Sequence, residues 1–179
     1  NWPLYPPSVR FNGVGAVVSC ILSHSGGGFF NLTKLPERTP LLMLATGPAV
    51  CPLLSIPKTE DLWQRMDKVV LVHGVRTREE LTYRSIVEQI QQTQSEQSIT
   101  IASITREQIP GTLHQRLPDA IRSGDLESVA GLQFDPKTTH VMICGSPEMV
   151  EESMAALKEK GLRKHRRRTP GHITVEIYK

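Results

Sequence analysis

The sequence predicts an α/β protein, a five-stranded and mainly parallel sheet with helices on both faces, preceded by an irregular N-terminal segment. From residue 39 onward, short apolar runs alternate with segments of helical periodicity, which is typical of strands buried on both faces of a parallel sheet. Residues 1–38 instead contain four prolines and a glycine triplet, without a sustained period of 2 or 3.6. We therefore expect one domain at 39–179 and leave 1–38 unassigned.

Four apolar runs and one alternating segment predict the five strands. The runs are LLMLA at 41–45, VVLV at 69–72, ITIASI at 99–104 and VMIC at 141–144. Near the C-terminus, the pattern of a half-buried strand appears, in which polar residues alternate with Ile173, Val175 and Ile177. Two further short strands, at 15–22 and 29–32, would need pairing partners that this chain does not clearly supply.

Helices are predicted between these strands. The longest spans 77–92 and begins with Thr77 as its N-cap. Its apolar face consists of Tyr83, Ile86, Val87 and Ile90. Shorter helical segments are expected at 51–56 and at 118–122, the second ended by Gly124.

The helix that follows the fourth strand has the clearest boundaries. Ser146 suits the N-cap because its hydroxyl can accept a free backbone N–H, and Pro147 suits the first helical position because no N–H donor is needed there. Gly161 predicts the C-terminal stop. We therefore expect this helix to run between Pro147 and Gly161.

Composition and cysteine spacing exclude several classes of protein. The chain of 179 residues is 39% hydrophobic and 22% charged, as in ordinary globular proteins. Its longest apolar run, at 14–22, is about half of the roughly 20 residues that a membrane helix needs. Cys20, Cys51 and Cys144 form no CxxC pair and have no histidines at metal-ligand spacing. We therefore expect a cytoplasmic protein with no membrane contact, no disulfide framework and no bound metal.

The positive charge is concentrated in one tract at 163–168. The net charge of the chain is +3, but this tract contributes five positive charges, so the rest of the chain carries −2, from 16 basic and 18 acidic residues. A nucleic-acid-binding domain would spread its basic residues over one face, so we do not expect a nucleic-acid partner. The tract is either a solvated linker between a helix and a strand or a patch for nuclear localisation or a polyanion.

Polar residues and glycines follow the predicted strands, and ligands of parallel sheets bind at that edge. These residues are Thr46, Gly47, Gly74, Arg76, Arg106, Gly145, Ser146 and Pro147. A turn that leads into a helix N-terminus presents free N–H groups to phosphate, and arginine adds bidentate contacts. We therefore predict a mononucleotide or dinucleotide site, in which the arginines favour the additional phosphate of NADP over NAD.

The same residues also have plainer interpretations. The phosphate-binding fingerprints GxGxxG and GxxxxGK[ST] are absent from the sequence. Gly74 and Gly145 would then be simple turns, and Cys144 a small buried hydrophobic residue. The arginines near the strand ends would be surface charges paired with neighbouring carboxylates, that is Arg76, Arg78, Arg106 and Arg116 with Glu79, Glu80 or Asp119.

Longer strings point to a family. From about 41 to 178 the chain resembles the NADP-binding half of the bacterial ferredoxin-NADP reductases, or flavodoxin reductases, through LLMLATG, VVLVHGVRTREELTY, SITREQ, GTLHQRLPDAI, HVMICGSPEMV and GLRKHRRRTPGHITVEIY. The resemblance implies an oxidoreductase that passes electrons between NADPH and ferredoxin or flavodoxin through FAD. The last string contains the basic tract, so targeting is no longer its expected role, and contact with an acidic ferredoxin or flavodoxin is the alternative.

The resemblance implies where NADP(H) would bind. Arg76, Arg106 and Arg116 correspond to arginines around the NADP phosphates, the last two at the 2′-phosphate, and Tyr83 to a residue near the adenosine. The family's loop Thr-Gly-Thr-Gly-x-Ala-Pro lies against the nicotinamide and pyrophosphate and corresponds to 46–52. There Thr46, Gly47 and Pro52 match, whereas Pro48, which has no N–H donor, and Ala49 do not. This difference implies weaker binding or a rebuilt loop.

The resemblance also implies catalytic residues. In the family's Cys-Gly-x-Pro motif, matched by Cys144, Gly145 and Pro147, the cysteine lies beside the nicotinamide carbon that gives up hydride. Glu176 and Tyr178 match the C-terminal segment, whose aromatic residues cover the flavin in the family. Cys144 and Glu176 are therefore the candidate catalytic residues, and Tyr178 is a candidate cofactor contact.

The flavin-binding half of such a reductase is not recognisable. The family's Arg-x-Tyr-Ser motif is absent, and 1–38 would be at most a remnant of the flavin-binding barrel. The first residue is Asn1 rather than methionine, so either the true start has been trimmed or the chain is a fragment. Without a flavin to accept electrons, we expect the chain to be colourless and inactive alone. The alternative is a truncated, non-catalytic module that binds NADP weakly or only folds.

Overall fold

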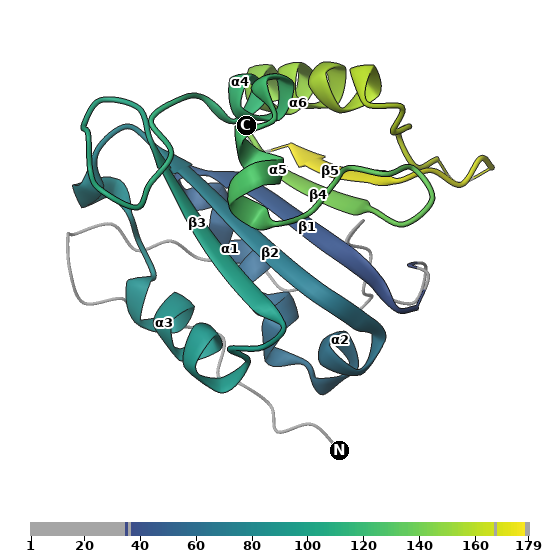
Figure 1. Cartoon of the computed structure of the whole chain (residues 1–179), viewed down its shortest axis with the longest axis horizontal. Coiled ribbons are helices and arrows are strands. Elements are labelled where there is room, and N and C mark those ends of the chain that lie inside the picture. Colours follow the sequence, from purple (N-terminus) through teal and green to yellow (C-terminus); the bar gives the residue numbers. More distant parts are fainter. Residues whose placement is uncertain (1–34, 36, 167, 178–179) are drawn as a thin grey trace.

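The computed structural model describes residues 35, 37–166 and 168–177 (Figure 1). Five strands form one sheet in the order β3-β2-β1-β4-β5, and each neighbouring pair is parallel. The strands are β1 (Thr39–Thr46), β2 (Met66–Val75), β3 (Ser98–Ile104), β4 (His140–Gly145) and β5 (Ile173–Ile177). The five strands predicted from 39 onward are therefore confirmed. The two strands considered at 15–22 and 29–32 lie outside the described residues.

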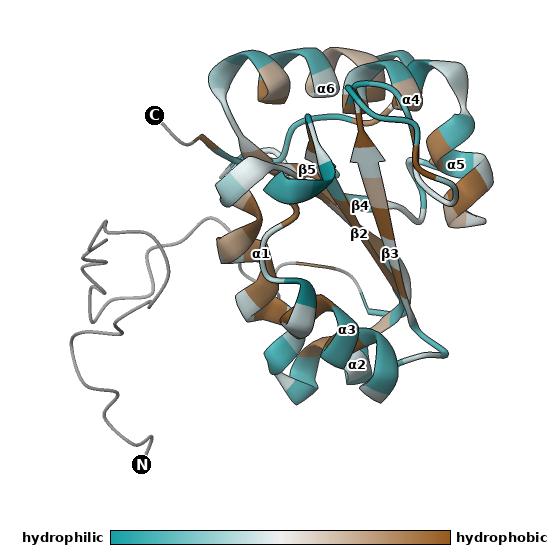
Figure 2. Cartoon of the chain, turned by 90° about the vertical axis from the view of Figure 1, so that its left-hand side faces the viewer, coloured by the Kyte–Doolittle hydropathy of each residue, from teal (hydrophilic) through white to brown (hydrophobic). Residues whose placement is uncertain are grey.

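Helices cover both faces of the sheet (Figures 1 and 2). One face carries α4 (Leu117–Ser123), α5 (Asp125–Ala130) and α6 (Pro147–Glu159). The other face carries α1 (Val50–Ser55), α2 (Glu60–Arg65) and α3 (Arg84–Thr93). Short 3-10 turns are η2 (Gly47–Ala49), η3 (Ile56–Lys58) and η4 (Arg78–Glu80). The predicted α/β fold with helices on both faces is confirmed.

Burial on both faces explains why the sequence of β1, the central strand, is apolar without interruption. Leu42 and Leu44 of β1 pack into the core beneath α4, α5 and α6. Leu41, Met43 and Ala45 point to the opposite face and pack into the core shared with α1 and α2. All five side chains are fully buried, because successive residues of a strand alternate between two covered faces.

The helix predicted at 77–92 is wrong in its first part. A 3-10 turn, η4, follows Thr77, and α3 begins only after Tyr83, which adopts a left-handed conformation with φ +61°. The Glu80 carboxylate accepts the backbone N–H of Arg76 at 2.9 Å. This bond ties the short turn to the end of β2, so the chain does not continue as a helix from there.

The remaining predicted helices are confirmed. The segment at 51–56 is α1, the segment at 118–122 is α4 and ends at Gly124 with φ +84°, and the helix after β4 is α6. The Ser146 hydroxyl accepts the backbone N–H of Met149 at 3.3 Å, as its N-cap role requires. Helices α2 and α5 are not predicted; each has six residues, as α1 does, and so shows less than two turns of periodicity.

The basic tract connects α6 to β5 and folds back along the start of that strand. The Arg163 carbonyl accepts N–H groups from His172 and Ile173, and the His165 N–H bonds to the Ile173 carbonyl. Gly171 permits this close approach, since a Cβ there would lie 2.6 Å from the carbonyl oxygens of residues 163 and 164. The described arginines and the lysine of the tract are exposed, as expected of a solvated linker.

Two histidines meet where this linker reaches the sheet. The ring centroids of His140, the first residue of β4, and His172 lie 6.1 Å apart. The Nδ1 atom of His140 is buried and has no hydrogen-bond partner among the described residues. Burial lowers the pKa of His140, and the neighbouring His172 and His165 lower it further. Burial also lowers the pKa of His172, and Arg163 adds to that shift.

From these histidines we predict that acid destabilises the fold. A histidine with a lowered pKa contributes its full stability above the unfolded-state value of 6.5, and loses it as the pH falls below that value, because the unfolded chain then binds the proton more readily. The thermal midpoint should therefore be lower at about pH 5.5 than at about pH 7.5. His140→Phe should reduce this difference, as measured by circular dichroism.

Ile143→Val is the matched control, because it alters the neighbouring core without touching an ionisable group. It should lower the midpoint by a similar amount at both pH values, at a cost of about 0.5–1.5 kcal/mol. An unchanged pH dependence in His140→Phe would show that His140 is not the group responsible.

Candidate functional site

A cleft of about 840 Å³ lies at the carboxyl edge of the sheet. It is lined by the turns that follow β1, β2, β3 and β4 and by the first turn of α4. The lining includes seven of the predicted site residues, which are Thr46, Gly47, Gly74, Arg76, Arg106, Arg116 and Ser146. The cleft therefore lies where the parallel sheet predicts a ligand site, and it gathers residues from five separate segments of the sequence.

Strand register brings these segments together. Thr46 at the end of β1 pairs with Gly74 of β2, and the end of β2 pairs with the end of β3. Beyond the strands, the Arg106 N–H donates to the Arg76 carbonyl at 2.8 Å, so the two arginines lie on adjacent backbone segments. Two of the predicted phosphate ligands are thus placed next to each other by an extension of the sheet's own hydrogen bonding.

Two glycines allow the walls of the cleft to approach closely. A Cβ on Gly74 would lie 3.1 Å from both Leu117 Cγ and Thr46 Cγ2. A Cβ on Gly145 would lie 2.8 Å from Thr46 Oγ1 and would overlap Met149 Cε. These glycines are therefore more than simple turns, because a side chain at either position would crowd Thr46 at the end of β1.

The cleft arginines are only partly neutralised by carboxylates. Arg116 forms ion pairs with Glu152 at 2.7 Å and with Glu148 at 3.7 Å, both on α6. Within the part of the chain that the structure describes, Arg76 and Arg106 form no ion pair.

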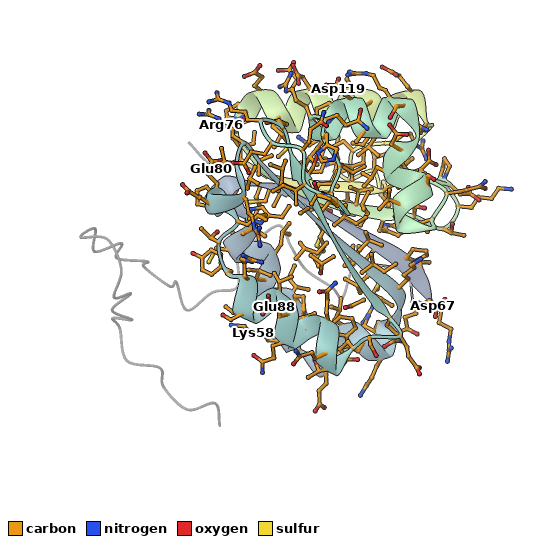
Figure 3. The ribbon with its side chains drawn as sticks, turned by 60° about the vertical axis from the view of Figure 1, so that its left-hand side comes forward. Lys58, Asp67, Arg76, Glu80, Glu88 and Asp119 are labelled. Atoms are coloured by element: carbon orange, nitrogen blue, oxygen red, sulfur yellow. The ribbon has the colours of Figure 1, made fainter. Side chains whose placement is uncertain are left out.

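The carboxylates expected to pair with the arginines are engaged elsewhere. Asp119 pairs with Arg122 at 3.7 Å. Glu80 bonds to the backbone of Arg76 and not to its guanidinium. Figure 3 shows Arg76 and Glu80 at the same end of the sheet, far from Asp67 at the other end of β2. Arg76 and Arg106 are therefore not paired as the plainer interpretation expects. Arg116 is an exposed charge paired with carboxylates, but with those of Glu148 and Glu152 rather than Asp119.

The loop after β1 forms a tight turn. Gly47 adopts φ +53°, and Pro48 lies in the first turn of η2. The Val50 N–H closes this turn by bonding to the carbonyls of Gly47 and Pro48. The loop is therefore a short 3-10 turn that runs directly into α1.

Several lining residues are missed by sequence reasoning. They are Glu80, Thr82, Ser103, Thr105, Gln115 and Met149. The Ser103 hydroxyl donates to the Gln115 carbonyl at 2.5 Å, and thereby holds the segment before α4 against the end of β3. Thr105 follows a strand end, so its position could have been found in the sequence, whereas this contact of Ser103 with Gln115 has no local signal.

Other predicted site residues lie behind or beside the cleft lining. Gly145, Pro147, Tyr83, Cys144 and Glu176 do not line it, and residue 178 lies outside the described residues. Tyr83 packs, half-buried, against the core beneath α1 and α2. Cys144 is fully buried and pairs in register with Glu176 of β5.

The Cys144 thiol is electrically neutral at physiological pH. Burial raises its pKa to about 11, and the negative charge of Glu176 and the proximity of Cys51 contribute to the rise. Its sulfur therefore shapes the end of β4 as a small apolar group, as its plainer interpretation states.

Neither a metal centre nor a membrane segment accompanies the cleft in the described residues. No group of three or more histidine, cysteine or acidic side chains there is arranged to hold a metal ion. No helix there is long and apolar enough to cross a bilayer.

Comparison with known proteins places this fold and cleft in a family. The family model of the oxidoreductase NAD-binding domain matches residues 43–154. The chain belongs to this family. The match spans β1 to α6 and so contains the residues that line the cleft.

Individual relatives extend the match. The chain is 40% identical over 152 residues to the flavodoxin/ferredoxin-NADP reductase of Escherichia coli, and 36% identical over 152 residues to that of Buchnera aphidicola from Baizongia pistaciae. Each alignment covers 84% of this chain and 61% of the relative. A crystal structure of a ferredoxin NADP+ reductase from Neisseria gonorrhoeae, with bound FAD and NADP, superposes with a TM-score of 0.77 at 32% identity, over 84% of this chain and 60% of that one.

These matches confirm the resemblance to the NADP-binding half of the ferredoxin-NADP reductases. The chain spans about three fifths of the length of these relatives. Membership in the family of the oxidoreductase NAD-binding domain is therefore established, and the activity of a whole reductase is a proposal.

The site geometry predicts that Cys144 is inert to thiol reagents in the folded protein. A pKa of about 11 leaves about one thiolate in ten thousand at neutral pH, whereas Cys51 is exposed. In a Cys20→Ser background, Ellman's reagent should modify one thiol rapidly and a second only after unfolding in guanidinium. Adding Cys51→Ser should abolish the rapid reaction. A rapid reaction that persists in the Cys20→Ser, Cys51→Ser protein would contradict the buried position of Cys144.

Proposed function

We propose that the cleft binds NADP(H) and that the chain is the pyridine-nucleotide part of a ferredoxin-NADP or flavodoxin-NADP reductase. The observation that carries this proposal is the convergence of Arg76, Arg106 and Arg116 on one cleft at the carboxyl edge of the sheet. Arginine binds phosphate through charge-assisted, bidentate hydrogen bonds. The names of the relatives and the ligands of the Neisseria structure support the same assignment.

The 2′-phosphate is assigned to Arg106 and Arg116, and the third arginine to the other phosphates. Arg116 is already paired with Glu152, but the side chains are 51% and 34% exposed. A surface pair of this kind is worth about 0–1 kcal/mol. A 2′-phosphate carries more negative charge than one carboxylate and can accept bidentate hydrogen bonds from a guanidinium, so it can compete with Glu152 for Arg116. Glu152 would then hold the guanidinium near its working position before the nucleotide arrives.

The nicotinamide end is assigned to the turn after β1 and to the ends of β4 and β5. Thr46 and Gly47 line the cleft there, and Gly145 packs behind Thr46. Because the Cys144 thiol stays protonated, its assigned role is to shape the surface beneath the nicotinamide and to exclude water. Glu176, in register with Cys144, is assigned to the same end of the nucleotide.

The adenosine end is assigned to the segment after β2. Thr82 lines the cleft, and Tyr83, which follows it in the sequence, is assigned to the adenosine because of the family resemblance. Pro147 lies next to Ser146, which lines the cleft at the start of α6. Tyr178, although outside the described residues, stays a proposed cofactor contact because of its position in the family's C-terminal motif.

FAD belongs to this proposal only through the whole reductase. The flavin motif Arg-x-Tyr-Ser is absent from the sequence, so the described residues are assigned to binding and orienting the nicotinamide nucleotide alone. FAD held elsewhere in an intact reductase would supply the step from hydride to single electrons. The electron carrier is proposed to be a ferredoxin or flavodoxin, and the exposed basic tract offers a positive surface for an acidic carrier.

The proposal predicts that 2′-phospho-AMP binds and AMP does not bind comparably. Each of Arg106→Ala and Arg116→Ala should weaken 2′-phospho-AMP by about tenfold or more, because each removes a charge-assisted contact of about 1.5–3 kcal/mol. Isothermal titration calorimetry at low salt measures both affinities.

Arg122→Ala is the matched control, since Arg122 lies on α4 close to Arg116 but does not line the cleft. It should change the affinity by less than about twofold. If 2′-phospho-AMP binds no better than AMP, or if neither arginine variant weakens it, the assignment of the cleft to NADP fails.

A further inference from the structure

A buried histidine stands directly behind the loop that forms one wall of the cleft. His73 lies in β2, next to Gly74, and is 3% exposed. Its Nε2 atom is 2.9 Å from the carbonyl oxygen of Gly47. A carbonyl oxygen can only accept, so Nε2 must carry the hydrogen. A side chain of β2 thus holds the backbone segment that follows β1.

The Gly47 carbonyl is the fixed point of this loop. It accepts the Val50 N–H, which closes η2, and it accepts His73 Nε2–H from the sheet side. Gly47 itself adopts φ +53°, a conformation that a residue with a side chain rarely takes. Two hydrogen bonds therefore orient the peptide group of Gly47, a residue whose backbone can adopt many conformations because it has no side chain.

Apart from these bonds, the turn is held at its end by the burial of Ala49, which is 3% exposed. The Thr46 side chain makes no capping hydrogen bond to the turn that follows it. Pro48 contributes no N–H at all. The direction of the remaining backbone groups toward the cleft therefore depends on the torsions at Gly47, and these depend on where its carbonyl is held.

The ring of His73 is suited to this task in its neutral form. Burial lowers its pKa, and the hydrogen bond to Gly47 opposes that shift only in part. His73 does not line the cleft, so it is not placed to bind a phosphate directly. His73 therefore provides a rigid, uncharged hydrogen-bond donor behind the loop that forms one wall of the cleft.

We propose that His73 is a positioning residue that sets the shape of the turn Gly47–Ala49 and thereby the affinity of the cleft for the pyrophosphate and nicotinamide half of the nucleotide. This inference rests on the proposed NADP(H) site. It assigns His73 no contact with the nucleotide and no part in binding the 2′-phosphate, which is assigned to Arg106 and Arg116.

The test compares NADP+ with 2′-phospho-AMP, which has the same 2′-phosphate-bearing adenosine end but lacks the nicotinamide half. His73→Leu removes the donor, and His73→Gln is the conservative variant, because the glutamine amide nitrogen lies near the position of histidine Nε2. His73→Leu should weaken NADP+ by about tenfold, the cost of about one lost buried hydrogen bond, and should change 2′-phospho-AMP by less than about twofold. His73→Gln should restore the NADP+ affinity to within about threefold of the wild type.

The outcomes separate this inference from the proposed function. If wild-type protein binds neither ligand, the NADP(H) site itself is wrong. If 2′-phospho-AMP binds but His73→Leu weakens both ligands equally, or weakens neither, the site stands and the positioning role of His73 is overturned. An NADP+ affinity no higher than that of 2′-phospho-AMP in the wild type would also overturn it, because the loop would then contribute nothing.

A second measurement needs no variant and so does not depend on how a substituted strand folds. Long-range ¹⁵N–¹H NMR of the imidazoles reports which ring nitrogen carries the proton. The inference requires the Nε2–H form of His73 at neutral pH, with slow exchange of that proton. A neutral ring protonated at Nδ1 would mean that the bond to Gly47 does not exist, and would overturn the proposal.

Discussion

The parallel register of β1 with its two neighbours is the constraint on which the rest of the structure depends. It aligns Thr46 with Gly74 on one side and Ala45 with Cys144 on the other, so three strands end at one level. Gly47, Arg76 and the turn into α6 follow those ends directly, and Arg106 follows β3, which pairs with β2. The register is held by side chains buried on both faces, which a one-residue slip would move to the wrong face.

Beyond the strand ends, the shape of the cleft is set by the loop after β1, and its charge by arginines that are not fully neutralised. The loop after β1 is fixed by hydrogen bonds to one carbonyl, that of Gly47, and the walls meet because Gly74 and Gly145 carry no side chain. Of the three cleft arginines, Arg116 is held by α6, while Arg76 and Arg106 form no ion pair among the described residues. Such a combination of rigid backbone and available cations suits an anionic ligand with several phosphates.

The strands and two of the cleft arginines could be predicted from the sequence. Buried parallel strands have continuous apolar sequences, and Arg76 and Arg106 follow two of them closely. What could not be predicted depends on contacts between distant segments. Glu80 folds the start of an expected helix back onto β2, and Ser103 holds the segment before α4. His73 follows an apolar run, and nothing local in the sequence indicates that its Nε2 atom bonds to the Gly47 carbonyl in the loop after β1. Two of the three six-residue helices, α2 and α5, are not predicted, because less than two turns leave little periodicity to detect.

The cleft is proposed to recognise a nucleotide by its additional phosphate. The affinities of the unmodified chain for NADP+ and for NAD+, both determined by calorimetry at low salt, test this most directly. The account predicts that NADP+ binds at least about tenfold more tightly, since arginine contacts to the 2′-phosphate are each worth about 1.5–3 kcal/mol. The preference should shrink as salt is added, because the cleft arginines are exposed. Equal affinities for the two nucleotides, or no binding of NADP+, would contradict it.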